Sequence, residues 1–190
     1  MSRIYRLMKL EEKYKKEIVP QLIEEFKMKN DLAVPRVTKV VINVGLKEAL
    51  DDKGILEKVS EELALITGQM PKICQARKSI AGFKLRAGVP IGLMVSLRHK
   101  RMYAFLEKLF NIALPRVKDF QGVSPGSFDG NGNYTLGLEE QIVFPEIDSA
   151  KIEKIHGLEV TIVTSTHDDK KAKRFLELMG MSFKKNGEKK

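Results

Sequence analysis

The feature that most constrains the fold is the order in which helical and strand-like segments follow one another. Apolar residues recur every three or four positions among charged residues in segments typical of amphipathic helices. These are residues 10–26, 55–66, 100–114 and 168–179. Segments with β-branched runs or apolar and polar alternation lie between or beside them, at 36–44, 71–77, 90–97, 134–144 and 158–164. The order α-β-α-β-β-α-β-β-α predicts an α+β fold, a two-layer sandwich of one mostly antiparallel sheet with helices packed on one face.

The length and composition set the domain count. A chain of 190 residues with 43% hydrophobic residues can bury one substantial core. We therefore predict a single domain over residues 1–183, in which Asp51 or Asp52 caps the second helix. The Lys-rich residues 184–190 are expected to form a disordered tail.

The charge of the chain is concentrated in one stretch. Residues 63–106 contain no Asp or Glu in 44 positions, although the whole chain has 25 acidic residues. The stretch holds eight of the 34 Lys and Arg residues, so it carries nearly all of the net charge of +9. Its cations are Lys72, Arg77, Lys78, Lys84, Arg86, Arg98, Lys100 and Arg101. A stretch without carboxylates cannot neutralise itself, which predicts a polyanionic partner, with nucleic acid as the first candidate.

The densest part of this stretch runs from Gln75 to Arg86, where four cations alternate with small residues and one aromatic. Arg offers a planar donor fork to phosphate and Lys a mobile charge, while Ser79 adds a hydroxyl and Gly82 permits close backbone approach. The ring of Phe83 could stack on a base or a sugar. The alternative is a solvated hairpin whose charges only aid solubility. The absence of acidic residues, which a merely soluble surface intersperses, favours polyanion binding.

The number of cysteines and the hydropathy pattern indicate the cellular compartment. The single cysteine, Cys74, excludes an intrachain disulfide and a CxxC pair, as in a reducing cytosol. No uncharged apolar run approaches the ~20 residues that span a bilayer, and the first residues lack the apolar core of a secretory signal. The sequence therefore predicts a soluble cytoplasmic protein.

Two patterns resemble a metal or cofactor site but lack residues that such a site requires. Asp129, Asn131, Asn133 and Glu140 imitate the oxygen spacing of a calcium loop, but Tyr134 stands where the sharp turn needs glycine. The glycines nearby do not form a GxGxxG pattern, and no Walker GxxxxGK[ST] pattern occurs. We expect neither a metal nor a cofactor.

The histidines do not indicate catalysis. His99 lies in the basic cluster, His156 at a predicted turn, and His167 at a predicted helix start where Asp168 can cap the helix. Ser165, His167 and Asp168 resemble a triad only in composition, because near neighbours in sequence do not converge in the required geometry. We expect no catalytic residue and no enzyme. Two other classes stay open at this point: an RNA-modifying enzyme, which would need a cofactor pocket or an acid-base pair, and a peripheral protein of anionic membranes.

Several blocks of the sequence, taken in order, resemble large-ribosomal-subunit protein family five, which binds 5S ribosomal RNA. The blocks are Val41–Gly45, Ile66–Gln69, Ala76–Ala81, Gly82–Arg86, Pro90–Gly92, Arg101–Tyr103, Leu114–Val117, Phe128–Tyr134 and Glu140–Glu146. The resemblance extends from about Tyr5 to Phe183, and the Phe128–Tyr134 block is similar to the bacterial or organellar branch. Lys72 departs from the family pattern, which has an apolar residue there, and the tail after Phe183 is longer and more basic.

The resemblance implies an α+β sandwich in the central protuberance of the large subunit, where it helps attach 5S rRNA to the large-subunit rRNA without catalysis. It implies a contact of the basic loop with transfer RNA in the peptidyl site (P-site tRNA). It also implies contacts with small-subunit head protein thirteen and with neighbouring large-subunit 5S-binding proteins, and no membrane partner.

The residues that the resemblance implies fall into two sets. The expected 5S rRNA contacts are Arg36, Lys39, Asn43, Gln69, Ser96 and Arg98. The expected P-site tRNA contacts are Gln75, Arg77, Lys78, Ser79, Phe83, Lys84 and Arg86.

Overall fold

The computed structural model describes residues 9–50, 54–148, 152 and 154–184. They divide into two compact units. Unit 1 comprises the chain up to residue 40 with residues 98–136 and 161 onward, and unit 2 comprises residues 41–97 and 137–160. The predicted caps Asp51 and Asp52, and the predicted tail beyond residue 184, lie outside the described residues. The single domain over residues 1–183 stays a prediction.

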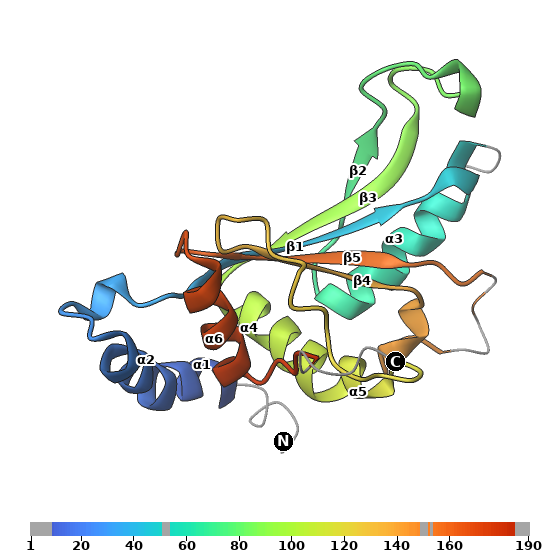
Figure 1. The fold of residues 1–190 in the computed structure, drawn as a ribbon. Helices are drawn as coiled ribbons and strands as arrows, with labels where there is room; N and C mark the ends of the chain where they lie inside the picture. Colours follow the sequence, from blue (N-terminus) through green and yellow to red (C-terminus); the bar gives the residue numbers. More distant parts are fainter. Residues whose placement is uncertain (1–8, 51–53, 149–151, 153, 185–190) are drawn as a thin grey trace. The chain divides into compact units, whose positions relative to one another are not determined.

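The strands form one open antiparallel sheet in the order β2-β3-β1-β5-β4 (Figure 1). They are β1 (Val37–Gly45), β2 (Lys72–Gln75), β3 (Pro90–Leu97), β4 (Tyr134–Leu138) and β5 (Leu158–Thr164). The helices are α1 (Lys9–Lys13), α2 (Val19–Phe26), α3 (Gly54–Thr67), α4 (His99–Lys108), α5 (Leu114–Arg116) and α6 (Asp169–Met179). The predicted α+β class and the predicted order of helices and strands are confirmed.

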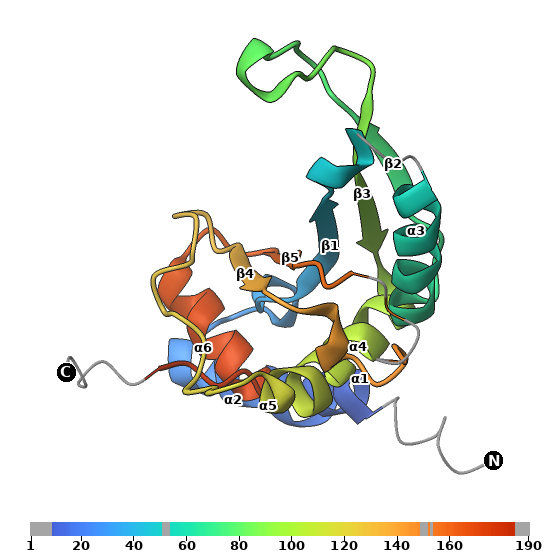
Figure 2. The same ribbon diagram turned by 90° about the vertical axis from the view of Figure 1, so that its right-hand side faces the viewer.

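Buried and exposed side chains alternate along the strands of unit 2. In β3, Leu93, Val95 and Leu97 are buried while Ser96 is exposed, as a strand with one covered face requires. Helix α3 packs against β3 with a buried side that includes Leu63. The packing leaves the opposite face of these strands open, as both views of the ribbon show (Figures 1 and 2).

Two devices fix the local geometry of unit 2. A Cβ at Gly92 would lie 2.7 Å from the carbonyl oxygen of Val44, so this position admits only glycine where β1 and β3 approach closely. Gly68 has a φ of 70° and ends α3, because glycine adopts the left-handed conformation without steric cost. The chain can then turn directly into β2.

Unit 1 holds the remaining helices. The N-terminal segment is helical as predicted, but a π-helical turn over Tyr14–Ile18 separates α1 from α2, and Pro20 stands in the first turn of α2. Its apolar stripe is buried at Leu10, Ile18 and Leu22. Within this unit α1 packs against α4, and α6 packs against the π-helical turn.

Two predicted boundaries differ from the structure. Helical backbone does not stop before Pro115 but continues to Arg116, because a wider π-helical turn over Leu109–Ala113 places Pro115 in the first turn of α5, where a missing N–H is tolerated. The strand expected over 134–144 ends at Leu138 and is followed by a 3-10 turn over Gln141–Val143. Burial of the Gln141 side chain at this turn breaks the alternation.

Candidate nucleic-acid interface

The segment from Gln75, the last residue of β2, to Arg86 forms most of the connection from β2 to β3, and we call it the basic loop (Figures 1 and 2). Its base continues the ladder: the Ala76 N–H donates to the Val89 carbonyl at 2.8 Å, and the Gly88 N–H donates to the Ala76 carbonyl at 2.9 Å. The loop is therefore an extension of the β2–β3 hairpin with a defined backbone path.

The tip of the basic loop has a structure of its own. Ile80 and Leu85 exchange backbone hydrogen bonds of 2.9 and 3.1 Å around a 3-10 turn over Ala81–Phe83. Lys84 ends this turn with a φ of 51°, a conformation that costs free energy for a residue with a Cβ. Ser79 Oγ accepts the Ala87 N–H at 3.0 Å, which leaves its own hydroxyl hydrogen available for a partner.

The charges of the basic loop are not neutralised inside the protein. Arg77, Lys78, Lys84 and Arg86 are all exposed, and no ion pair among the described residues includes any of them. Gln75 at the end of β2 is exposed as well. The loop thus presents positive charge and hydrogen-bond donors to a partner, which is the requirement for contacting phosphate.

The open face of unit 2 carries the sequence-predicted Asn43 and Ser96. Asn43 is exposed between the buried Ile42 and Val44, and Ser96 is exposed on the neighbouring strand. Gln69 lies apart from the strands, half-buried in the turn after α3. Amide and hydroxyl groups on a flat sheet face can bond ribose hydroxyls and base edges.

Sequence reasoning missed Lys72 as a member of this face. In the β2–β3 pairing Lys72 lies opposite Met94 and Cys74 opposite Gly92, so Lys72 lies on the same face as Ser96 and is exposed. The apolar residue expected there would have been exposed to solvent. The sequence did carry a signal for this position. Lys72 and Cys74 are two positions apart, and residues two apart in a strand lie on the same face.

In unit 1 the structure places three more predicted contacts. Arg36 is exposed just before β1, and its backbone is fixed by Ser165, whose N–H donates to the Arg36 carbonyl at 2.9 Å and whose Oγ accepts the Arg36 N–H at 3.1 Å. Lys39 is half-exposed on β1, and Arg98 is exposed at the N-cap position of α4. All three side chains can reach a phosphate.

The calcium-like pattern has a structural explanation. Asp129 accepts the N–H groups of Asn131 and Asn133 at 2.8 and 3.1 Å, and the Asn133 side chain donates to it at 2.7 Å. The Asn133 side chain holds the pKa of Asp129 below its ordinary value, with further help from the Asn131 N–H. The oxygens are therefore used inside the loop, and no cluster of metal-ligating side chains occurs within the described residues.

The same loop is tied to its neighbours. The Gly132 N–H donates to Asp169 at 2.7 Å, the Gly132 carbonyl accepts from the Thr164 hydroxyl at 2.7 Å, and Asn133 Oδ1 accepts the Thr164 N–H at 3.2 Å. Phe128 and Tyr134 flank it with ring centroids 4.8 Å apart. Burial raises the pKa of Tyr134 to about 12. We call residues 128–134 the Gly-rich block. Its contacts make it an anchor, that is, a loop that joins neighbouring segments of unit 1.

The three histidines lie in three different settings. His99 and His167 are exposed, and Asp168 caps α6 by accepting the Lys170 N–H at 2.9 Å, as predicted. His156 is mostly buried in unit 2, where its Nδ1 lies 3.9 Å from a Glu62 carboxylate oxygen. Sequence reasoning missed this titratable pair because the two residues are far apart in the chain.

The pair is locked into the fold by Gln141. The fully buried Gln141 side chain accepts the backbone N–H of His156 at 2.8 Å and donates to the Lys154 carbonyl at 2.9 Å. Burial raises the pKa of Glu62 and lowers the pKa of His156, so the neutral form of each side chain is favoured. This network holds the segment after β4 in place.

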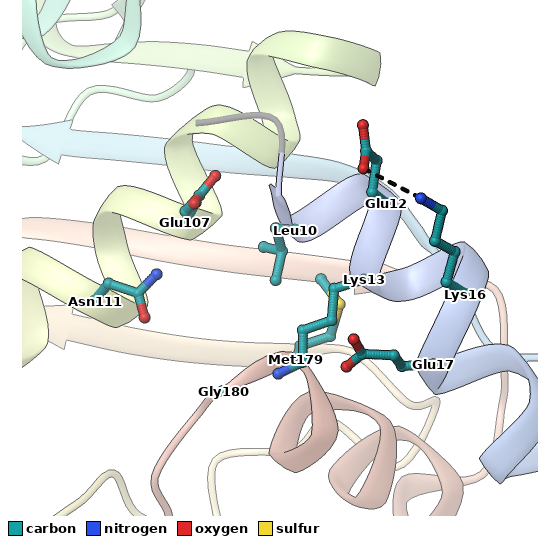
Figure 3. Close-up of a pocket in the computed structure, with 9 residues that line it drawn as sticks. All are labelled: Leu10, Glu12, Lys13, Lys16, Glu17, Glu107, Asn111, Met179 and Gly180. Atoms are coloured by element: carbon teal, nitrogen blue, oxygen red, sulfur yellow. Dashed lines mark ion pairs between the residues drawn. The ribbon is translucent and has the colours of Figure 1, made fainter. Parts of the chain in front are cut away.

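A surface pocket of about 520 Å³ lies in unit 1. Figure 3 shows Glu107 and Asn111 on one side of it and the charged side chains of α1 and the following π-helical turn on the other. Lys16 and Glu12 pair at 3.6 Å on its rim. The described residues that line it include no serine, cysteine or histidine. Within the described residues no helix is long and apolar enough to cross a membrane.

Comparison with known proteins identifies the family of the chain. The family model for ribosomal protein L5 matches residues 30–86, and the model for the C-terminus of the same ribosomal family matches residues 90–183. The large ribosomal subunit protein uL5 of Dictyoglomus turgidum is 57% identical over 176 residues, which cover 93% of this chain and 98% of the relative. That of a Thermoanaerobacter species is 56% identical over 93% of this chain and 99% of the relative, and that of Geotalea daltonii is 54% identical over 93% and 98%. The two family models and these identities over nearly the full length show that the chain belongs to the ribosomal protein L5 family.

Proposed function

We propose that this large-ribosomal-subunit protein binds 5S rRNA, helps attach it in the central protuberance, and contacts P-site tRNA with its basic loop. Its family is one of structural ribosomal proteins, which agrees with the expectation that it is not an enzyme and works in the cytoplasm. The observation that carries the proposal is the basic loop, whose four exposed cations have no ion pair among the described residues.

The open face of unit 2 supports the assignment of 5S rRNA to the sheet. Asn43 and Ser96 are exposed polar side chains on neighbouring strands, and Lys72 adds a cation on the face of Ser96. A-form RNA hides its major groove, so a protein reads shape, 2′-hydroxyls and unpaired bases. Short polar side chains on a flat surface suit that kind of contact, and Gln69 at the adjoining turn would extend it.

Arg36, Lys39 and Arg98 are proposed as phosphate contacts of 5S rRNA. Their side chains are exposed or half-exposed, and the Ser165 bonds to Arg36 fix the backbone from which its guanidinium extends. A guanidinium group can bond two phosphate oxygens at once, whereas Lys39 would act as a mobile charge. These contacts position the RNA without reading its sequence.

The basic loop is proposed as the P-site tRNA contact because it is separate from the sheet face. Arg77, Lys78, Lys84 and Arg86 would bind phosphates, and Ser79 would donate its hydroxyl hydrogen. Contacts with the large-subunit rRNA, with small-subunit head protein thirteen and with neighbouring 5S-binding proteins belong to the same proposal.

The test separates the two surfaces. We expect Arg77→Ala combined with Lys78→Ala to leave folding and 5S rRNA binding unchanged and to weaken P-site tRNA binding to reconstituted large subunits. The matched variant is Asn43→Ala combined with Ser96→Ala, which should weaken 5S rRNA binding in a filter assay and leave the loop unaffected. Each lost phosphate contact should reduce the slope of log affinity against log salt by about 0.7 to 0.9.

Two outcomes would contradict the proposed division between the two surfaces. Loss of 5S rRNA binding by a folded Arg77→Ala, Lys78→Ala variant would assign the loop to 5S rRNA instead. Failure of the parent chain to prefer 5S rRNA over a transfer RNA of similar size in a stoichiometric complex would remove the 5S assignment itself.

A further inference from the structure

We infer that the tip of the basic loop, Ile80 and Phe83, docks on an exposed nucleobase face of the transfer RNA, with Phe83 as the stacking residue. This inference rests on the proposed contact of the loop with P-site tRNA and adds its chemistry. The cations of the loop would hold the backbone of the RNA, and the tip would contact a base that is not covered by its neighbours.

The first observation is the exposure of the tip. The Phe83 side chain is 63% exposed and Ile80 is 46% exposed, although both are large and apolar. No ring pair and no cation–ring contact of the described residues includes Phe83. Exposure of large apolar side chains is unfavourable in water, and two of them at one tip between exposed cations fit an interaction site better than a single scattered apolar residue would.

The second observation is that the tip is held in place. The reciprocal bonds between Ile80 and Leu85 close the 3-10 turn, and the left-handed Lys84 lets the chain return directly after Phe83. A non-glycine residue in this conformation persists where the surrounding structure imposes it. The backbone that carries the ring therefore loses little additional freedom on binding, which favours affinity.

The third observation selects RNA over protein as the partner of the tip. Arg77 and Lys78 precede the tip and Lys84 and Arg86 follow it, so any partner must present negative charge on both sides of an apolar face. A folded RNA does this with phosphates beside an uncovered base, and stacking on aromatic rings tolerates any base because each has a π-face. A protein partner would need an apolar pocket ringed by carboxylates.

The chain offers a clean spectroscopic test because it contains no tryptophan. In the full-length chain, Phe83→Trp places a single indole at the tip, and stacking on a base should quench its fluorescence when transfer RNA is added. The matched control is Leu65→Trp, because Leu65 on α3 is also 63% exposed and also lies in the acid-free stretch. Its fluorescence should not change with transfer RNA.

Affinity measurements supply the second readout. Phe83→Ala should lower the affinity for transfer RNA by about fivefold to a hundredfold with an unchanged salt slope, because stacking neutralises no phosphate. Phe83→Trp should retain the parent affinity, and Phe83→Leu should fall toward the alanine variant because it keeps apolar area but has no ring. Leu65→Ala should bind as the parent does.

Three outcomes would overturn the inference. If transfer RNA binds Phe83→Ala with the parent affinity and leaves the indole of Phe83→Trp unquenched, the tip does not stack and the proposed loop contact survives. If the indole emission of Phe83→Trp shifts to the blue without quenching on addition of small ribosomal subunits, the tip fits a protein pocket. If the parent chain binds 5S rRNA but no transfer RNA, the proposed tRNA contact and this inference both fail.

Discussion

The basic loop and helix α6 carry the same number of cations and use them in opposite ways. Each has four Lys or Arg residues within about a dozen positions. In α6, Arg174 Nε donates to both Glu25 carboxylate oxygens at 2.9 and 3.0 Å, and Lys171 lies 5.9 Å from the centroid of the Phe26 ring. In the basic loop no cation is in an ion pair with any of the described residues.

The difference lies in what surrounds each segment. Helix α6 lies within unit 1 among acidic residues and aromatic rings, so Lys173 also lies 5.7 Å from the centroid of the Phe183 ring and 4.0 Å from a Glu177 carboxylate oxygen. The basic loop projects from a stretch without carboxylates. Charge density alone therefore does not identify a binding surface. The presence of intramolecular partners decides whether a basic segment supports the fold or faces an external anion.

The two segments should differ most in how they tolerate the substitution of a glycine by alanine. Gly132, whose N–H donates to Asp169 at the start of α6, has a φ of 74°, and a Cβ there would overlap the Thr166 carbonyl. We expect Gly132→Ala to lower the free energy of unfolding by about 3 kcal/mol or more. Gly82→Ala in the basic loop, where a Cβ meets nothing within 4 Å, should change it by less than about 0.5 kcal/mol. Urea unfolding of both variants measures the difference, and equal losses would contradict the contrast.

A smaller effect is expected at two polar side chains that each accept one backbone N–H. Asp168 caps α6 through the Lys170 N–H at 2.9 Å, and Ser79 accepts the Ala87 N–H at 3.0 Å in the basic loop. Asp168→Ala should cost about 1 kcal/mol of unfolding free energy. Ser79→Ala should cost less than half of that because water replaces the acceptor at an exposed site, but it should weaken tRNA binding. A greater loss of stability in Ser79→Ala would show that the loop supports the fold.

Hydrophobic periodicity and the residues that begin or end helices predicted most of the fold. The bounds of β3 and β5, and the cap and end of α6 at Asp168 and Gly180, follow directly from alternation, capping chemistry and a glycine with positive φ. These are local properties, since a few neighbouring residues determine them. The π-helical turn before Pro115 could not be predicted, because it depends on how the whole helix packs.

The candidate site was predictable in its charge and less so in its geometry. The acid-free stretch and the basic loop are visible in the sequence, and the loop cations are exposed as a binding surface requires. The membership of Lys72 in the open face depends on the pairing of β2 with β3, and the neighbourhood of Glu62 and His156 depends on packing across the chain. Non-local contacts of this kind leave no periodic pattern.

One cation of each segment, Arg174 in α6 and Lys78 in the basic loop, should respond differently to substitution by alanine. Arg174→Ala should lower the free energy of unfolding by about 0.5–1 kcal/mol, because Arg174 Nε donates to both Glu25 oxygens in a pair that is exposed to solvent. Its salt slope of RNA binding should equal that of the parent. Lys78→Ala should leave stability unchanged and lower the salt slope of tRNA binding by about 0.7 to 0.9. The contrast between the two segments is wrong if Arg174→Ala changes the salt slope of RNA binding or if Lys78→Ala changes the free energy of unfolding.

The smallest effect concerns the acid dependence of the anchor beside α6. Hydrogen bonds from Asn133 and the Asn131 N–H hold the pKa of Asp129 below its ordinary value of 3.8, so the carboxylate contributes stability above that pH and loses it as the pH falls through the lowered pKa. Asp129→Asn should therefore be less stable than the parent at pH 7, and the gap should close on acidification below about pH 4. The basic loop contains no carboxylate. After correction for the intrinsic pH dependence of amide hydrogen exchange, acidification should lower the protection of the Asn131 and Asn133 amides and leave the protection of the Ile80 and Leu85 amides unchanged. A gap that stays constant from pH 7 to pH 3 would mean that the Asp129 charge does not stabilise the anchor, and that the Gly-rich block is held by its backbone and aromatic contacts alone.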